Sequence, residues 1–171
     1  MLGLEELNLS DNYLEGGIPP EIGHMKRLKM VNFSNNQLEG RVAEELGICC
    51  TRLESLSLDM NKLRGPIPDS LYNLTQLTEL FLNDNQLEGI LSPVVGNLHK
   101  LECLQIAHNK LTGSFPAAIG KLEKLVQLNV SENEFVGTVP SGLRDLEYLE
   151  IADFRHNAAM TCAFESDNIL I

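Results

Sequence analysis

Aliphatic residues recur along the chain in a fixed order, which returns every 24 residues with a single interval of 25. The first leucine of each copy is Leu4, Leu28, Leu53, Leu77, Leu101, Leu125 and Leu149. A period in this range is typical of stacked repeats, each of which buries its apolar side against its neighbours. The pattern therefore predicts a solenoid rather than a single central core.

Each copy opens with a segment in which apolar and polar residues alternate, as in a strand with one buried face. We expect seven such strands, all parallel. An asparagine ends each segment, and its amide can both donate to and accept from the backbone of a tight turn and of the next copy. We therefore interpret this row as structural and not as a ligand site: Asn12, Asn36, Asn61, Asn85, Asn109, Asn133 and Asn157.

The second half of each copy contains a glycine, from Gly16 to Gly137, four residues after the asparagine, where a backbone turn excludes larger side chains. After it we expect a second extended piece around Ile18, Val42, Ile67, Leu91, Phe115 and Val139. A proline follows in most copies and suits the start of a helical turn. One more aliphatic residue then predicts a short helical or 3-10 segment on the opposite side of the coil.

These copies read as LNLSDNYLEGGIPPEIG, LSLDMNKLRGPIPDSL, LQIAHNKLTGSFPAAIG and LNVSENEFVGTVPSGL. The pattern resembles the plant-type subclass of the leucine-rich repeat family, whose second half reads L-x-G-x-I-P-x-x-I/L-G-x-L, over about residues 1–149. The resemblance implies an α/β fold: a curved right-handed superhelix with a parallel concave sheet and short helical or 3-10 convex segments. Residues 1–157 are expected to form about seven repeats, and residues 158–171 a non-repeat tail that either covers the last strand or frays.

Composition and charge narrow the classes of partner. Hydrophobic residues make up 43% of the chain, aromatic residues only 5%, and tryptophan is absent, which fits an aliphatic core. The net charge of −11 argues against nucleic acid and anionic lipid as partners and favours a basic one. An acidic surface that only keeps the repeats soluble is the more ordinary explanation.

No apolar run reaches the 18 residues that a membrane-spanning helix needs, and the start has no signal-peptide pattern. We therefore expect no membrane insertion by these residues. Plant-type ectodomains usually carry paired cysteines in caps at both ends, and this chain has neither cap. The four cysteines are expected to be reduced, with Cys49 in the buried place that Leu74 and Leu98 hold, and Cys50 as the inserted residue.

The residues between and just after the strand leucines point away from the core and are expected to cover the concave sheet. Their polar, variable character favours a surface that binds a protein or peptide. Phe81 is the one aromatic residue there and, with Met60 and Glu79 nearby, is the first candidate anchor; an incidental exposed ring is the alternative. The candidate binding residues are Asp59, Met60, Glu79, Phe81, Asn83, Asp84, Gln105, His108 and Glu132.

Asp84, His108, Glu132 and His156 fall on successive strands and raise the question of a metal or pH-sensitive cluster. His108 and His156 would lie about 10 Å apart, which is too wide for a single ion unless their side chains lean together. A solvated ladder of charges is the preferred interpretation. We predict no metal and no cofactor.

Four N-x-S/T sequons are present, at Asn8, Asn32, Asn73 and Asn129, and they matter only if the chain enters the secretory route. Three of them, at Asn8, Asn32 and Asn129, arise from the repeat itself, because its strand segment often has the sequence N-x-S. Asn73 lies on the expected convex side and would be the most accessible.

No motif for phosphate binding, kinase activity, nucleophilic hydrolysis or zinc hydrolysis is present, so we predict no enzyme. We predict a non-catalytic module that binds a protein or peptide through its concave face. By resemblance its role is receptor-like, a co-receptor is a further implied partner, and the location is the plasma membrane or the cell exterior. Two alternatives stay open: a fragment of a receptor-like serine/threonine kinase, or a free intracellular scaffold, which would be cytoplasmic if the chain is complete.

Overall fold

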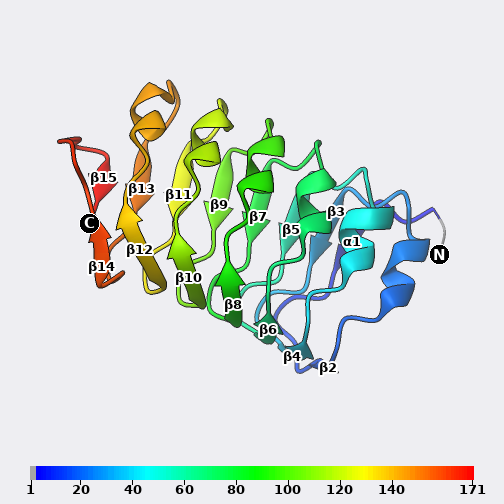
Figure 1. Cartoon of the computed structure of the whole chain (residues 1–171). Coiled ribbons are helices and arrows are strands. Elements are labelled where there is room, and N and C mark those ends of the chain that lie inside the picture. Colours follow the sequence, from blue (N-terminus) through cyan, green and yellow to red (C-terminus); the bar gives the residue numbers. More distant parts are fainter. Residues whose placement is uncertain (1–2) are drawn as a thin grey trace.

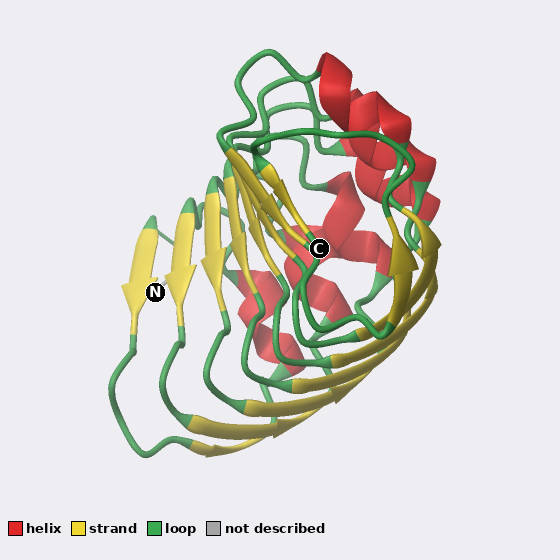
Figure 2. Ribbon diagram, turned by 90° about the vertical axis from the view of Figure 1, so that its left-hand side faces the viewer, coloured by secondary structure: helices red, strands yellow, loops and turns green. Residues whose placement is uncertain are grey.

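A computed structural model describes residues 3–171, which coil into a stack of similar turns with the two termini at opposite ends (Figure 1). Each turn contributes one strand to a first sheet and one strand to a second sheet, and each turn except the last also contributes one short helix. The two sheets and the row of helices surround a common interior (Figure 2). The predicted α/β solenoid is confirmed.

The first sheet contains eight strands, and every pair of neighbours is parallel. Its strands are β1 (Glu6–Asn8), β3 (Met30–Asn32), β5 (Ser55–Ser57), β7 (Glu79–Phe81), β9 (Cys103–Gln105), β11 (Gln127–Asn129), β13 (Ile151–Asp153) and β15 (Ile169–Leu170). Equivalent residues of successive copies pair directly, as Leu80 does with Leu104. The seven predicted parallel strands are confirmed, and the tail adds an eighth.

The second sheet has seven strands: β2 (Glu15–Gly16), β4 (Gln37–Gly40), β6 (Lys62–Gly65), β8 (Gln86–Ile90), β10 (Lys110–Ser114), β12 (Glu134–Thr138) and β14 (Ala159–Thr161). Our prediction placed this extended piece after the glycine, and that placement is wrong. The six glycines from Gly16 to Gly137 have φ between +78° and +89°, a conformation that bends the chain. The ladder therefore ends at the glycine or one residue beyond it, before Ile18 and its equivalents.

The helices are η1 (Pro20–His24), α1 (Glu44–Cys49), η2 (Asp69–Asn73), η3 (Pro93–Asn97), η4 (Ala117–Lys121) and η5 (Ser141–Asp145). They form the convex side, as predicted. Five are 3-10 turns, and only the second copy, which has the extra residue, forms an α-turn. In this α-turn the Cys50 amide donates to the carbonyl of Leu46, four residues earlier, at 3.2 Å. In the next copy the Leu74 amide donates to the carbonyl of Leu71, only three residues earlier.

This α-turn corrects our assignment of the two cysteines. The extra residue is taken up inside the helix, so Cys50, not Cys49, occupies the buried leucine position. Cys49 is partly exposed, and all four cysteines are free thiols. Burial raises the pKa of Cys50 to about 11, and the neighbouring Cys49 adds to this shift. Cys50 therefore acts as a small core residue.

The asparagine row binds each turn to the next, as predicted. The side-chain amide of Asn109 donates to the carbonyls of Leu82, Ile106 and Ala107 at 3.0–3.2 Å, and its oxygen accepts from the Leu87 amide at 2.9 Å. These partners belong to the turn itself and to the preceding copy. A buried amide thus replaces ladder bonds that the tight turn cannot supply.

The two ends of the stack differ. At the C-terminal end the tail lies against the last repeat, because the Ala152 and Phe154 amides donate to the Asn168 and Leu170 carbonyls. At the N-terminal end an apolar cavity of about 510 Å³, lined by residues such as Leu7, Leu14 and Phe33, opens between the first turns. Within residues 3–171, no helix has both the length and the apolar character required to cross a lipid bilayer.

Candidate functional site

The parallel register of the first sheet arranges its outward side chains in rows across the strands. Glu79 and Phe81 stand on either side of buried Leu80 in β7, so both face outward. Glu79 pairs in register with Cys103, and Phe81 with Gln105. The predicted candidates Glu79, Phe81 and Gln105 are therefore brought together.

A shallow depression of about 290 Å³ lies beside Phe81 on this face. Its lining residues are Glu79, Phe81, Glu102, Cys103, Val126 and Gln127. Phe81 and Val126 are half-buried and give the depression an apolar wall, while the exposed carboxylates of Glu79 and Glu102 border it. This combination of an aromatic ring with a polar rim is typical of a binding anchor.

Cys103 lies in the same depression, and sequence reasoning did not select it. Burial raises the pKa of its thiol, the Glu79 charge raises it further, and a hydrogen bond from the Gln105 amide, 3.5 Å from the sulfur, works in the opposite direction. The thiol is thus protonated at neutral pH and has little nucleophilic character. It contributes a soft, weakly polar surface.

The candidates that follow the strands occupy a different part of the face, the edge formed by the carboxyl ends of the first-sheet strands, which we call the carboxyl edge. The residue before each asparagine has a left-handed backbone, with φ between 51° and 60° at Asp11, Asn35, Met60, Asp84, His108, Glu132 and His156. This strain was not expected from the sequence; three Asn or Asp residues in the column were the available signal. Met60 is 51% exposed and does not line the depression beside Phe81.

Asp59 and Asn83 also lie on this carboxyl edge. Burial raises the pKa of Asp59, and the charges of Asp84 and Asp11 raise it further. The Asn83 amide donates to the Asp84 carboxylate at 2.7 Å. The edge between β5 and β7 is therefore acidic, and one of its carboxylates is partly withdrawn from water.

Among the residues of the predicted charge ladder, Asp84, His108, Glu132 and His156, one pair is in contact. His156 Nε2 lies 3.6 Å from a Glu132 carboxylate oxygen, while Asp84 and His108 are exposed. In the part of the chain that the structure describes, no three His, Cys, Asp or Glu side chains meet in a geometry that would hold an ion.

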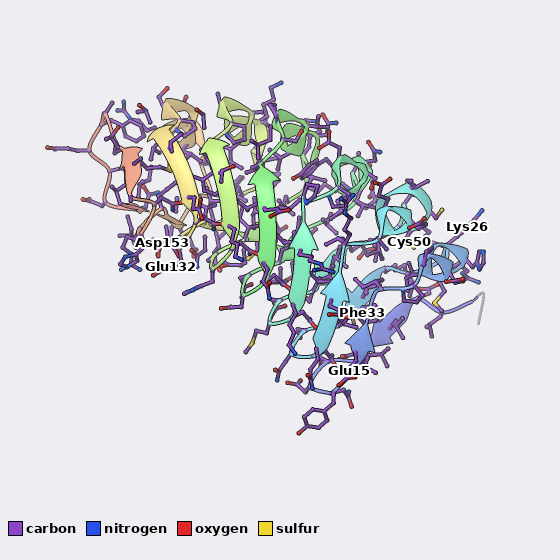
Figure 3. The ribbon with its side chains drawn as sticks, turned by 60° about the horizontal axis from the view of Figure 1, so that its bottom comes forward. Glu15, Lys26, Phe33, Cys50, Glu132 and Asp153 are labelled. Carbon is purple, nitrogen blue, oxygen red and sulfur yellow. The ribbon has the colours of Figure 1, made fainter. Side chains whose placement is uncertain are left out.

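An ion pair that the sequence did not indicate lies beside this contact. The Arg155 guanidinium donates to both carboxylate oxygens of Asp153, at distances between 2.7 and 3.2 Å, and this lowers the pKa of Asp153. Asp153 and Glu132 lie at the C-terminal end of the stack, far from Glu15 of the second sheet at the N-terminal end (Figure 3). The spacing D-x-R was the only sequence signal for this pair.

The four sequons lie in two kinds of place. Asn8, Asn32 and Asn129 end strands of the concave sheet, and each side-chain oxygen accepts from the amide of the serine two residues later, at 3.0–3.1 Å. Asn73 ends η2 on the convex side, and both Asn73 and Thr75 are exposed. A glycan at Asn73 would leave the concave face open.

Short parallel strands inside a curved stack and helical turns outside define a leucine-rich solenoid. The family model described as Leucine Rich Repeat matches five segments, residues 3–25, 52–74, 76–98, 100–122 and 124–146, which together exceed half of the chain. The chain belongs to the leucine-rich repeat family. A search of curated protein sequences gives no match.

Solved structures of plant receptors have the same fold. The ectodomain of the receptor kinase GASSHO1/SCHENGEN3 from Arabidopsis thaliana, in complex with CASPARIAN STRIP INTEGRITY FACTOR 2, is 34% identical over 89% of this chain and 18% of that chain, with a TM-score of 0.84. The plant peptide hormone receptor RGFR1 in complex with RGF2 is 31% identical over 89% and 24%, with a TM-score of 0.85.

A third structure contains two partners. Arabidopsis HAESA, in complex with the peptide hormone IDA and the co-receptor SERK1, is 30% identical over 88% of this chain and 30% of that chain, with a TM-score of 0.69. The chain thus spans less than a third of each of these receptor chains. It is similar to part of a plant receptor ectodomain.

Proposed function

We propose that the chain is a non-catalytic module that binds a protein or peptide on its concave sheet. The observation that carries this proposal is the depression beside Phe81, which combines an aromatic wall with a carboxylate rim on a sheet face that no other part of the described chain covers. Each inner strand is held by two neighbours, so the surface is formed before a partner arrives.

The similar receptors support this proposal. GASSHO1/SCHENGEN3 is in complex with CASPARIAN STRIP INTEGRITY FACTOR 2, and RGFR1 is a peptide hormone receptor in complex with RGF2. HAESA is in complex with both a peptide hormone and a co-receptor. A peptide ligand and a protein co-receptor are therefore the partners that we propose for the candidate residues Asp59, Met60, Glu79, Phe81, Asn83, Asp84, Gln105, His108 and Glu132. The similar structures include receptor kinases. The second candidate function is therefore that this chain is a part of the ligand-binding region of such a receptor kinase.

The cell exterior or the outer side of the plasma membrane is the location that fits this function, since the similar structures are plant receptors and that of GASSHO1/SCHENGEN3 is an ectodomain. We propose that Asn73 carries a glycan there, because its sequon is exposed and lies on the convex side. Secretion of the chain from a eukaryotic cell should give a glycosidase-sensitive mass that Asn73→Gln lowers by one glycan. A mass that Asn73→Gln does not change would contradict this assignment.

The location of binding is tested by selecting binders from a random peptide display library on the purified chain. Gln105→Arg places a bulky side chain beside Phe81, and Asn97→Arg places the same side chain on the convex side, where Asn97 is exposed. We expect Gln105→Arg to weaken the selected peptides about tenfold or more and Asn97→Arg to leave them unchanged. Equal effects of the two variants, or no selectable binder, would contradict the proposed function.

A further inference from the structure

The concave face has a strongly one-sided charge. Its outward strand positions and the turns directly after them carry eleven carboxylates and two Lys or Arg residues, Lys29 and Arg155. The carboxylates are Glu5, Glu6, Asp11, Glu54, Asp59, Glu79, Asp84, Glu102, Glu132, Glu150 and Asp153. Most of the net charge of −11 therefore resides on this one face.

Both cations of this face are already paired. Lys29 Nζ lies 2.8 Å from Glu5, and Arg155 is bound to Asp153 at 2.7 Å. The turns that precede the strands carry further cations, but these have other contacts or none. Lys100 donates to Gln76 at 2.7 Å, Lys124 lies 4.7 Å from the Tyr148 ring centroid, and Arg27 pairs with Glu5. Lys26 and Arg52, the remaining two, have no carboxylate within ion-pair distance among the described residues.

The two carboxylates that border the depression are therefore not neutralised within the described chain. Glu79 accepts a hydrogen bond from the Ser55 hydroxyl at 2.8 Å, and Glu102 is exposed. Between them lie the half-buried ring of Phe81 and the side chains of Cys103 and Val126. The site is thus an apolar depression flanked by two carboxylates that form no ion pair among the described residues.

We infer that the partner of this face is a cationic peptide segment, which places an apolar side chain in the depression beside Phe81 and Lys or Arg residues against Glu79 and Glu102. This inference rests on the proposed function and names its partner class. Unpaired carboxylates on one face repel each other, and a cationic segment removes that repulsion as it binds. The same field speeds the approach of a cationic partner and slows that of an anionic one.

A peptide segment fits this face better than a single ion. The carboxylates are spread along the strands, and no three of the described ones converge. An extended chain rises by about 3.3 Å per residue and turns every second side chain to the same side, so several of its side chains can face the sheet at once.

The test uses the peptides selected from the random library and measures both their composition and their response to charge. Glu79→Lys/Glu102→Lys reverses the rim of the depression. Glu123→Lys/Glu147→Lys, in exposed turns on the way from helix to strand, makes the same change in net charge away from it. Circular dichroism and the melting temperature of each variant establish that it is folded.

We expect the selected peptides to be rich in Lys and Arg around one apolar residue, and to lose at least about tenfold in affinity with the rim variant. The control variant should change affinity less than about twofold, and added salt should weaken binding. Neutral or acidic peptides that bind at Gln105, or cationic ones that ignore the rim reversal, would overturn the cationic partner and leave the proposed function standing. Binders that map away from the concave face, or no binders, would overturn both.

Discussion

At the scale of single residues, the fold depends on side chains that replace missing backbone bonds. Each buried asparagine of the row serves its own turn and the preceding one, so it links two repeats with one amide. The residue just before it accepts a left-handed backbone, with φ of 53° at His108. Such a conformation is unfavourable for residues other than glycine, and the bonds of the neighbouring asparagine hold it in place.

Asn109→Ala should therefore lower the free energy of unfolding by about 1–3 kcal/mol, because it leaves the buried Leu87 amide without its acceptor and takes one donor from each of three carbonyls. Denaturant melts measure the change. Asn97→Ala is the control, since Asn97 is exposed, and it should have almost no effect. Equal values for the two variants would show that the asparagine row does not stabilise the turns.

A substitution at Asp59 tests the electrostatics of the carboxyl edge. Its pKa is higher in the folded than in the unfolded chain, so ionised Asp59 destabilises the fold at neutral pH, and this penalty vanishes as the pH falls below the unfolded value of about 3.9. Asp59→Asn should raise stability at pH 7 by up to about 1 kcal/mol and give no gain at pH 3. Urea melts at both pH values decide this. A gain that is independent of pH would contradict the assignment to charge.

At the scale of elements, one helix carries a polar group without a partner. Tyr72 of η2 stands where Gly96 and Gly120 stand in later copies, and it is 1% exposed. Its hydroxyl oxygen makes no hydrogen bond within the described chain, and burial raises its pKa. The ring fills the convex layer, while the hydroxyl has lost water without compensation.

Tyr72→Phe removes that hydroxyl and keeps the ring, so it should raise the free energy of unfolding by about 1 kcal/mol. Tyr148→Phe is the matched control, because Tyr148 is 47% exposed and its hydroxyl is not buried without a partner; it should be neutral. Chemical denaturation of both variants is sufficient. A loss of stability with Tyr72→Phe would mean that the hydroxyl has a partner after all.

The elements also show which features a sequence of this kind reveals. The leucine period predicted the stack, the concave sheet and the convex helical turns, because one buried face per element repeats in every copy. It misplaced the second strands and exchanged Cys49 with Cys50, since both depend on where the backbone bends, and several neighbouring positions satisfy the same apolar pattern. At the candidate site, the columns brought Glu79, Phe81 and Gln105 together but missed Cys103 and the Asp153–Arg155 pair, which depend on side-chain contacts.

At the scale of the whole molecule, the repeats form a surface that is ready for a partner. Each inner strand is fixed by its two neighbours, and the tail adds β15 to the last one. Binding should therefore need little movement of the backbone, and the affinity should depend on a few outward side chains. Phe81 is the one among them with both an aromatic ring and a depression beside it.

The most direct test of the concave-face account is a calorimetric titration of one library-selected peptide into the natural chain and into Phe81→Ala. The account predicts that Phe81→Ala weakens binding by more than about 1 kcal/mol, roughly fivefold, while the circular dichroism spectrum and the melting behaviour remain those of a folded solenoid. An unchanged affinity in a folded Phe81→Ala variant would contradict the account and assign binding to another face of the solenoid.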